Sequence, residues 1–268
     1  MNEKKIGTEI KWFLGIVIAL SIPMEFAIIY FRALGLAVFL MVVPAMAAFI
    51  VVNVFERGQK HRLNFRLCQV KYILQAIMIP LTYIGLPYLL YWAANPQTLE
   101  PKPDKKFFLF LLICIPFSMI TAIWEEIGWR GFWVPRMYQK YGLTKTLLLT
   151  SLFWGCWHIP VLASGLYMPG TPVSYAFPLF LINVMASGVI AGILTIRSGS
   201  VWPSVFLHSA HNGFDQMVFG AYTVGENKMY FVSETGVITA VCSVLIAVFM
   251  WYQCVKAEQK GKGSGEII

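Results

Sequence analysis

Long apolar segments dominate this chain and limit what it can fold into. A helix crosses a lipid bilayer with about 20 mostly apolar residues, and segments near that length occur eight times among the 268 residues. Hydrophobic residues make up 58% of the chain and charged residues 13%, whereas a soluble domain has roughly 45–50% and about 25%. We therefore predict an all-α, polytopic membrane protein with about eight transmembrane helices. The predicted spans run from Trp12 to Phe31, Leu34 to Phe55, Tyr72 to Trp92, Phe107 to about Trp133, Thr146 to Ala163, Tyr175 to Ile196, Val201 to Gly220, and Thr235 to Cys254.

The basic residues predict the orientation of these spans. With eight spans both termini lie on one side of the membrane, and cytoplasmic loops carry an excess of Lys and Arg. If that side is the cytoplasm, the inner segments hold 16 Lys and Arg residues and the outer segments hold five. This bias predicts that both termini are cytoplasmic, and it explains the net charge of +8 without a nucleic-acid partner. We expect one integral-membrane domain over residues 1–268, and the short loops favour a bacterial plasma membrane.

Charged residues inside predicted spans need a physical reason, because inserting one into a bilayer costs roughly 2.5–3.5 kcal/mol. Glu125, Glu126 and Arg130 lie near the inner end of the fourth span. Glu126 and Arg130 are four residues apart, in the favourable order for an ion pair on one helix face, while Glu125 points about 100° away. We predict that Arg130 supports Glu126 structurally and that Glu125 is free for chemistry, although the same residues also fit an ordinary cytoplasmic loop.

Two further polar clusters lie in later spans. His158 is in the fifth span, and His208 and Asn212, four residues apart, share a face of the seventh. At 1.5 Å per residue, Glu125, His158 and His208 each lie about 16–20 Å along the helix from a basic residue on the inner side. The three spans therefore bring these residues to a similar depth. We predict a buried active site among spans four, five and seven, reached from the cytoplasmic side.

The residue types in this predicted site suit the activation of water. A carboxylate such as Glu125 can act as a general base, and a neutral imidazole such as His158 can share the same water. A second imidazole, His208, and the Asn212 amide could hydrogen-bond the oxyanion of a tetrahedral intermediate. Alternatively, Glu125, His158 and His208 could hold Zn²⁺ or another divalent metal, in the pattern of two histidines and one glutamate. The sequence leaves both mechanisms open.

Taken together, the three clusters resemble the CAAX protease and bacteriocin-processing (CPBP) family of intramembrane endopeptidases. The resemblance covers a motif-bearing core at about residues 107–220. Its second motif, an aromatic residue followed by x-x-x-His158, carries Trp154 where the family usually has Phe. The resemblance implies that one glutamate and one histidine activate water and that the later histidine and asparagine form the oxyanion site. By motif position, the implied catalytic set is Glu125, Glu126, His158, His208 and Asn212, with Arg130 in structural support.

The resemblance also implies a substrate class. Family members include prenyl-protein endopeptidases and bacterial proteins linked to bacteriocin maturation or self-immunity, so we expect a peptide or lipidated protein substrate attached to the membrane, with membrane lipids as the other partner. Two alternatives stay open. One is a bacteriocin self-immunity protein without catalysis, and the other is a proton-coupled transporter, whose pathway Glu25 in the first span would extend.

Overall fold

The computed structural model describes residues 3–55 and 63–264, and its regular elements are helices, as the sequence predicts. Arg57, Lys60 and Arg62, which belong to the predicted inner loops, lie outside the described residues. The α-helices are α1 (Glu3–Tyr30), α2 (Ala37–Phe55), α3 (Val70–Pro80), α4 (Leu86–Ala94), α5 (Lys105–Glu126), α6 (Val134–Tyr141), α7 (Leu143–Trp157), α8 (Ile159–Ala163), α9 (Val173–Ser198), α10 (Trp202–Asn212), α11 (Lys228–Phe231) and α12 (Val237–Ser264).

Three of these helices continue directly into π-helical segments, in which each backbone hydrogen bond spans one residue more than in an α-helix. The segment η3 (Leu81–Gly85) joins α3 to α4, η5 (Ile127–Trp133) joins α5 to α6, and η6 (Gly213–Phe219) follows α10. Glu126 is the last residue of α5 and Asn212 is the last residue of α10. Two of the three polar motifs therefore lie where an α-helix widens into a π-helix, an arrangement frequent at functional sites.

Six helical stretches of the described chain are long and apolar enough to cross a membrane, and the chain is an integral membrane protein. The prediction of about eight spans is confirmed for these six by length and composition. The predicted spans at 146–163 and 201–220 are not among the six. The helix α7 ends before Pro160, which lacks the amide hydrogen that would continue it, and the continuous stretch of α10 and η6 carries a run of polar residues between His208 and Gln216. The six stretches are Glu3–Tyr30, Leu34–Phe55, Val70–Ala94, Lys105–Tyr141, Val173–Ser198 and Val237–Lys260.

Large apolar side chains are exposed on the outer helices, as contact with lipid requires. Phe26 of α1, Leu112 and Phe117 of α5 and Phe249 of α12 are all more than 60% exposed. In water these surfaces would promote aggregation, whereas in a bilayer they face a solvent of similar polarity. The buried residues instead include charged groups of the helical segments, namely Glu9, Glu25, Glu125, Glu126, Arg130, Arg136 and Asp215.

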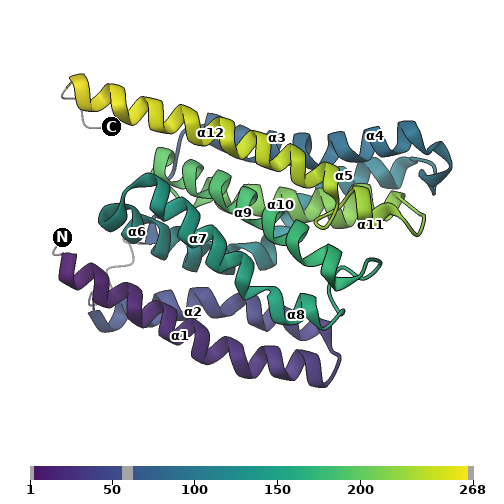
Figure 1. Ribbon diagram of the computed structural model, residues 1–268. Helices are drawn as coiled ribbons and strands as arrows, with labels where there is room; N and C mark the ends of the chain where they lie inside the picture. The colour runs from purple at the N-terminus through teal and green to yellow at the C-terminus, as the bar shows by residue number, and fades with distance from the viewer. Residues whose placement is uncertain (1–2, 56–62, 265–268) are drawn as a thin grey trace.

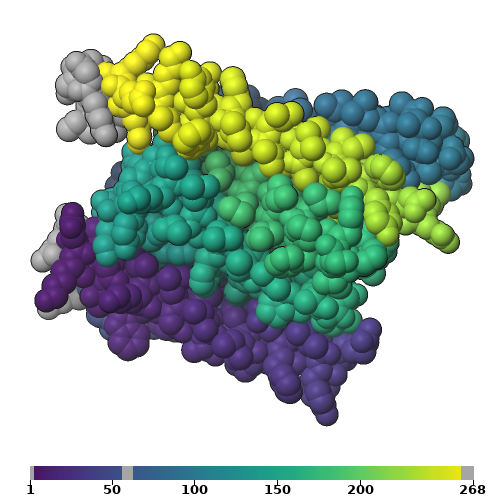
Figure 2. Space-filling view, viewed as in Figure 1, coloured from purple at the N-terminus to yellow at the C-terminus, as the bar shows by residue number. Residues whose placement is uncertain are grey.

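The helices form a bundle whose middle layer holds the polar motifs. The α1–α2 pair lies along one side, α12 lies with α3 and α4 along the opposite side, and α7, α9 and α10 lie between them (Figures 1 and 2). Within the bundle, α9 packs against α7 and α12, while α5 packs against α10 and α2. The helix α1 begins, and α12 ends, at the same end of the bundle (Figure 1), as an even number of crossings would require.

Two glycines allow backbones to approach closely around the middle layer. A Cβ atom at Gly128 in η5 would lie 2.4 Å from the backbone of Pro44 in α2, and one at Gly188 in α9 would lie 2.6 Å from the Ser151 hydroxyl of α7. Small residues at helix contacts provide close packing where no hydrophobic effect drives helices together in lipid. These contacts hold η5 close to α2 and α9 close to α7, and so help to fix the positions of the polar side chains on these segments.

Candidate active site

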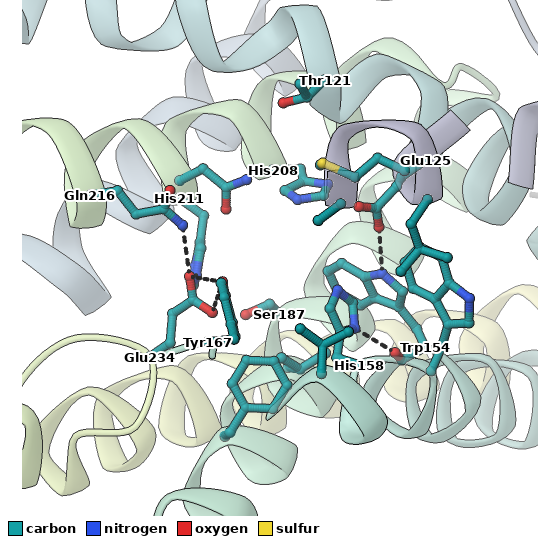
Figure 3. A pocket seen from close by; sticks show the side chains of 18 of the residues that line it. Thr121, Glu125, Trp154, His158, Tyr167, Ser187, His208, His211, Gln216 and Glu234 are labelled. Atoms are coloured by element: carbon teal, nitrogen blue, oxygen red, sulfur yellow. Dashed lines mark hydrogen bonds and ion pairs between the residues drawn. The ribbon is translucent and has the colours of Figure 1, made fainter. Parts of the chain in front are cut away.

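A cavity of about 270 Å³ lies between α2, α5, α7, α9 and α10. Polar side chains from three separate predicted spans line it: Glu125 at the end of α5, His158 between α7 and α8, and His208 and Asn212 at the end of α10. Figure 3 shows Glu125, His158 and His208 around this space, with Ser187 of α9 beside them. The structure thus brings together four of the five side chains in the predicted catalytic set, whereas Glu126 does not line this cavity, and their catalytic roles stay a prediction.

Trp154 contacts both residues that are predicted to activate water. Its indole Nε1–H donates to Glu125 Oε2 at 2.9 Å, and its backbone carbonyl accepts from His158 Nδ1 at 2.8 Å (Figure 3). Trp154 and His158 lie four residues apart at the end of α7, so the helix itself places the carbonyl beneath the imidazole ring. The Glu125 side chain reaches the same residue from α5.

These contacts decide which atoms of Glu125 and His158 remain available. A carbonyl oxygen can only accept a hydrogen bond, so Nδ1 of His158 must carry the proton, and in the neutral ring Nε2 is then an unprotonated acceptor. Since Oε2 of Glu125 accepts from the indole, Oε1 is the carboxylate oxygen left for another partner. The site therefore offers one carboxylate oxygen and one imidazole nitrogen, both able to accept a hydrogen bond from water.

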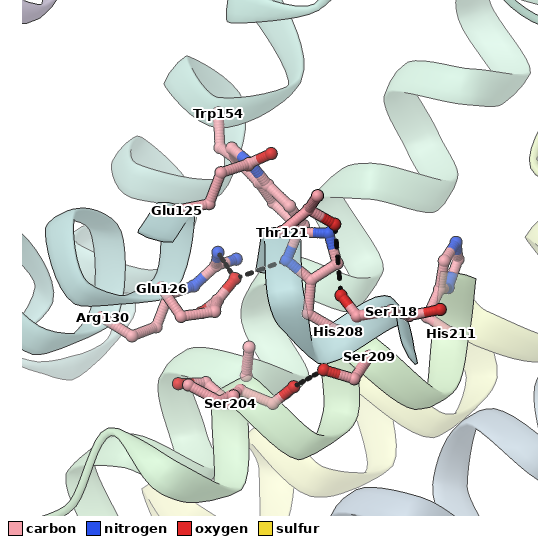
Figure 4. A network of polar contacts seen from close by, with 12 residues as sticks. Ser118, Thr121, Glu125, Glu126, Arg130, Trp154, Ser204, His208, Ser209 and His211 are labelled. Carbon is pink, nitrogen blue, oxygen red and sulfur yellow. Dashed lines mark hydrogen bonds and ion pairs between the residues drawn. The ribbon is translucent and has the colours of Figure 1, made fainter. Parts of the chain in front are cut away.

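Glu126 forms the structural network that the sequence predicted for it and extends that network to His208. Its Oε1 accepts from Arg130 Nη1 at 2.8 Å and from His208 Nδ1 at 2.9 Å (Figure 4). Glu126 is fully buried and Arg130 is 2% exposed. The Arg130 guanidinium also lies 4.0 Å from the centre of the Trp154 ring. Glu126 thus holds one of the cavity histidines, while Glu125 points toward Trp154 instead (Figure 4).

The opposite wall of the cavity carries polar residues that the sequence reasoning did not identify. Both carboxylate oxygens of Glu234 accept from the Tyr167 hydroxyl at 3.0 and 2.9 Å, and Oε1 also accepts from Gln216 at 3.2 Å (Figure 3). His211 Nε2 lies 3.7 Å from Glu234 Oε1, and its Nδ1 bonds Tyr83 at 2.8 Å. Burial alone would raise the pKa of Glu234, but His211, Tyr167 and Gln216 hold it below its usual value.

The sequence carried only a weak signal for this second wall. Glu234 and Tyr167 lie in connecting segments rather than in apolar helices, where a charged or hydroxyl residue needs no special explanation. His211 was visible as an intramembrane histidine, but its spacing from Asn212 places the two on different helix faces. The structure shows that the cavity is wide enough for His208, His211 and Asn212 all to reach it.

The described residues do not form an arrangement suited to a bound metal ion. No group of three or more His, Cys, Asp or Glu side chains in residues 3–55 and 63–264 is placed to hold one ion. Glu125, His158 and His208 share a cavity without converging as a ligand set, so we derive no step through a metal.

The cavity extends toward the end of the bundle that is remote from both termini. Its lining includes Leu34 in the turn between α1 and α2, Tyr167 between α8 and α9, and Glu234 before α12. The helix α1 runs from the terminal end toward Leu34, and α12 runs back from Glu234 to that end (Figure 1). The prediction of cytoplasmic access was based on the distances of Glu125, His158 and His208 from basic residues in the inner loops. It did not consider the segments at the opposite end of the bundle, which also border the cavity.

Comparison with known proteins finds a family whose model matches the part of the chain that carries the motifs. Residues 107–214 match the Rce1-like family, described as type II CAAX prenyl endopeptidase Rce1-like. A stretch of 54 residues is 37% identical to the CAAX prenyl protease 2 of Methanococcus maripaludis. That stretch amounts to 20% of this chain and 18% of the archaeal protein. The match at 107–214 contains Glu125, His158, His208 and Asn212, and it lies within the core predicted at about 107–220.

Proposed function

We propose, from the match of residues 107–214 to the Rce1-like type II CAAX prenyl endopeptidase family, that this integral membrane protein is a peptidase. Its reaction would be hydrolysis of a peptide bond in a lipidated protein or peptide attached to the membrane. The observation that carries the proposal is the shared cavity, in which Glu125 and His158 each keep one acceptor atom free while His208 and Asn212 lie close by.

The first step of the proposed mechanism is attack by water. Glu125 Oε1 accepts one proton of the water as its oxygen bonds to the carbonyl carbon of the substrate, and His158 Nε2 accepts a hydrogen bond from the other. Positioning of the water by two acceptors on different helices lowers the entropy cost of the attack. The product of this step is a tetrahedral intermediate whose former carbonyl oxygen carries a negative charge.

His208 and Asn212 are suited to stabilise that charge. The Asn212 amide supplies N–H donors, and each well-placed donor to an oxyanion contributes about 2.7–4 kcal/mol in other enzymes. His208 Nδ1 is bonded to Glu126, so Nε2 donates only when the ring carries both protons, a form that the adjacent carboxylate stabilises. Collapse of the intermediate breaks the carbon–nitrogen bond, and the proton held by Glu125 passes to the leaving amine.

The lining of the cavity is also suited to bind a substrate that carries an apolar anchor. Leu34, Val38 and Met41 line it beside the polar residues, and Val38 is 49% exposed. A lipid chain lowers the cost of bringing a peptide to the bilayer by about 0.8 kcal/mol per buried CH₂. The scissile bond has to be extended to meet the water, because peptide groups inside a regular helix are already hydrogen-bonded. We therefore propose a prenylated or similarly lipidated substrate.

The experiment that tests this function is peptide cleavage by the purified protein in liposomes. The proposal expects cleavage of a lipidated peptide by the wild type and a loss of at least 100-fold in the Glu125→Gln variant, which keeps the shape of the side chain but not its charge. Absence of cleavage by well-folded wild-type protein would contradict the peptidase assignment. The family description and the name of the archaeal relative both concern prenyl proteolysis and do not favour the self-immunity or transport alternatives.

The molecule offers two routes by which a substrate would enter the cavity, one from each side of the membrane. The basic loops predict a cytoplasmic active site in a bacterial plasma membrane, whereas Leu34, Tyr167 and Glu234 border the cavity at the end remote from the termini. Inside-out and right-side-out vesicles present opposite faces to an added peptide. Faster cleavage in inside-out vesicles would support the cytoplasmic route, and faster cleavage in right-side-out vesicles would assign entry to the face bearing these three residues.

A further inference from the structure

Trp154 has contacts that a residue serving only to fill space would not need. It is 7% exposed, and it is the hydrogen-bond partner of both Glu125 and His158. The contact with Glu125 uses the indole N–H, a group that phenylalanine lacks. The contact with His158 uses the backbone carbonyl and so depends on the position of the residue rather than on its side chain.

The surroundings of the indole hold it in one orientation. The Arg130 guanidinium lies 4.0 Å from the centre of the ring, and Arg130 is itself paired with Glu126. The His208 ring approaches edge-to-face with its centroid 5.5 Å away. Cation–π and edge-to-face contacts both favour specific ring geometries. The direction of the indole N–H is therefore fixed by the same residues that bind Glu126.

We propose that Trp154 is a positioning residue that fixes the Glu125 carboxylate for catalysis, an inference that rests on the proposed peptidase function. By occupying Oε2, the indole leaves Oε1 as the oxygen that meets the water. By accepting from Nδ1 of His158, the backbone carbonyl of the same residue leaves Nε2 as the second acceptor. Trp154 thus determines that Glu125 Oε1 and His158 Nε2 are the two atoms that hold the water. Through the contact of its ring with Arg130, it also connects this pair of acceptors to the buried Glu126–Arg130 ion pair.

The effect of losing the indole N–H follows from this geometry. In Trp154→Phe the ring still packs against Arg130, and the backbone carbonyl still accepts from His158. The Glu125 carboxylate, however, becomes free to rotate away from the water. A displacement of a reacting group by about 1 Å can cost about 100-fold in rate. We expect kcat to fall roughly 10-fold to 100-fold, with KM changed by less than about threefold, because substrate binding does not depend on this bond.

Trp92 provides a matched control in a distant part of the bundle. It is 8% exposed, and its Nε1–H donates to Thr223 Oγ1 at 3.0 Å, so Trp92→Phe also removes one buried indole hydrogen bond. This tryptophan does not line the cavity. The two variants undergo the same chemical change at equal burial. We expect kcat per folded molecule in Trp92→Phe to remain within about twofold of the wild type.

A double-mutant cycle on thermal stability tests the contact without relying on turnover. If Trp154 donates to Glu125, combining Trp154→Phe with Glu125→Ala should lower the melting temperature by less than the sum of the single changes. The pair Trp92→Phe with Glu125→Ala should be additive, since those residues are not in contact. Additivity in the first pair would overturn the proposal that the indole holds Glu125.

The kinetic and thermal results separate this inference from the proposed function. If the wild type cleaves the peptide and Glu125→Gln does not, but Trp154→Phe matches Trp92→Phe in kcat, the peptidase assignment stands and the positioning role is wrong. If the wild type does not cleave, the proposed function fails, and the stability cycle alone then decides whether Trp154 holds the carboxylate. A selective loss of kcat together with non-additive stability supports the role.

Discussion

Replacement of Glu126 by alanine should destabilise the protein more than the same replacement of Glu125, although the two carboxylates are neighbours in the sequence. Glu126 is fully buried and accepts hydrogen bonds from Arg130 and His208. Removing one member of a buried ion pair leaves an uncompensated charge and costs about 3–5 kcal/mol. Here the remaining charge is the Arg130 guanidinium, which is 2% exposed and has little access to water.

Glu125 has a smaller role in stability. Its carboxylate accepts a hydrogen bond from the Trp154 indole at 2.9 Å, so Glu125→Ala leaves one buried N–H group without its acceptor. An unsatisfied group of this kind costs about 1–3 kcal/mol. The expected order of stability is therefore wild type, then Glu125→Ala, then Glu126→Ala. Glu126→Gln should fall between the two alanine variants, because glutamine keeps an acceptor for Arg130 and adds no cavity.

The assay is thermal unfolding of the purified variants in one detergent, followed by circular dichroism, with peptide turnover measured per folded molecule. We expect Glu125→Ala to be folded and inactive, and Glu126→Ala to unfold at a clearly lower temperature and to lose activity as a result. Equal melting temperatures for the two alanine variants would refute the reasoning about the buried pair. Full turnover by folded Glu125→Ala would refute the assignment of the general base.

Other consequences can be measured in the same system. His158→Gln should lower turnover at least 100-fold with a smaller loss of stability than Glu126→Ala, and normal turnover would show that this ring does not contact the water. A chelator should leave turnover unchanged, because the described residues hold no set of three placed ligands; activity that is lost and then restored by added Zn²⁺ would contradict this. A lipidated peptide should be cleaved faster than the same peptide without its lipid, and equal rates would argue against the apolar anchor. Thiol labelling of Lys71→Cys in a background without the five native cysteines should occur from the cytoplasm, and labelling from outside would reverse the predicted topology.

Local spacing predicted some contacts well. The Glu126–Arg130 pair follows from residues four apart on one helix, and the structure places the two atoms 2.8 Å apart. His208 and Asn212 likewise share a face and line one cavity. In both cases the geometry is fixed by one stretch of helix, so no knowledge of neighbouring helices is needed.

Contacts between distant segments could not be predicted in this way. The bond between Trp154 and Glu125 joins residues 29 positions apart, and the wall formed by Glu234 and Tyr167 joins loops 67 positions apart. Hydropathy is averaged over a window, so it also failed to show that the predicted span at 146–163 is interrupted. That interruption depends on Pro160, whereas at 201–220 the helix continues from α10 into η6 without a break.

The sequence by itself determined that the chain is a helical membrane protein and which side chains are costly enough in a bilayer to require a function. Composition and the lengths of apolar segments suffice for this, because a lipid environment requires backbone hydrogen bonds to be satisfied within each segment. Only the tertiary structure decided what those side chains do to one another. The orientation of Trp154 between Arg130 and Glu125, and the choice of Oε1 as the free carboxylate oxygen, depend on how α5 and η5 pack against α7. Each of these contacts combines atoms from helical segments whose relative rotation no local pattern specifies.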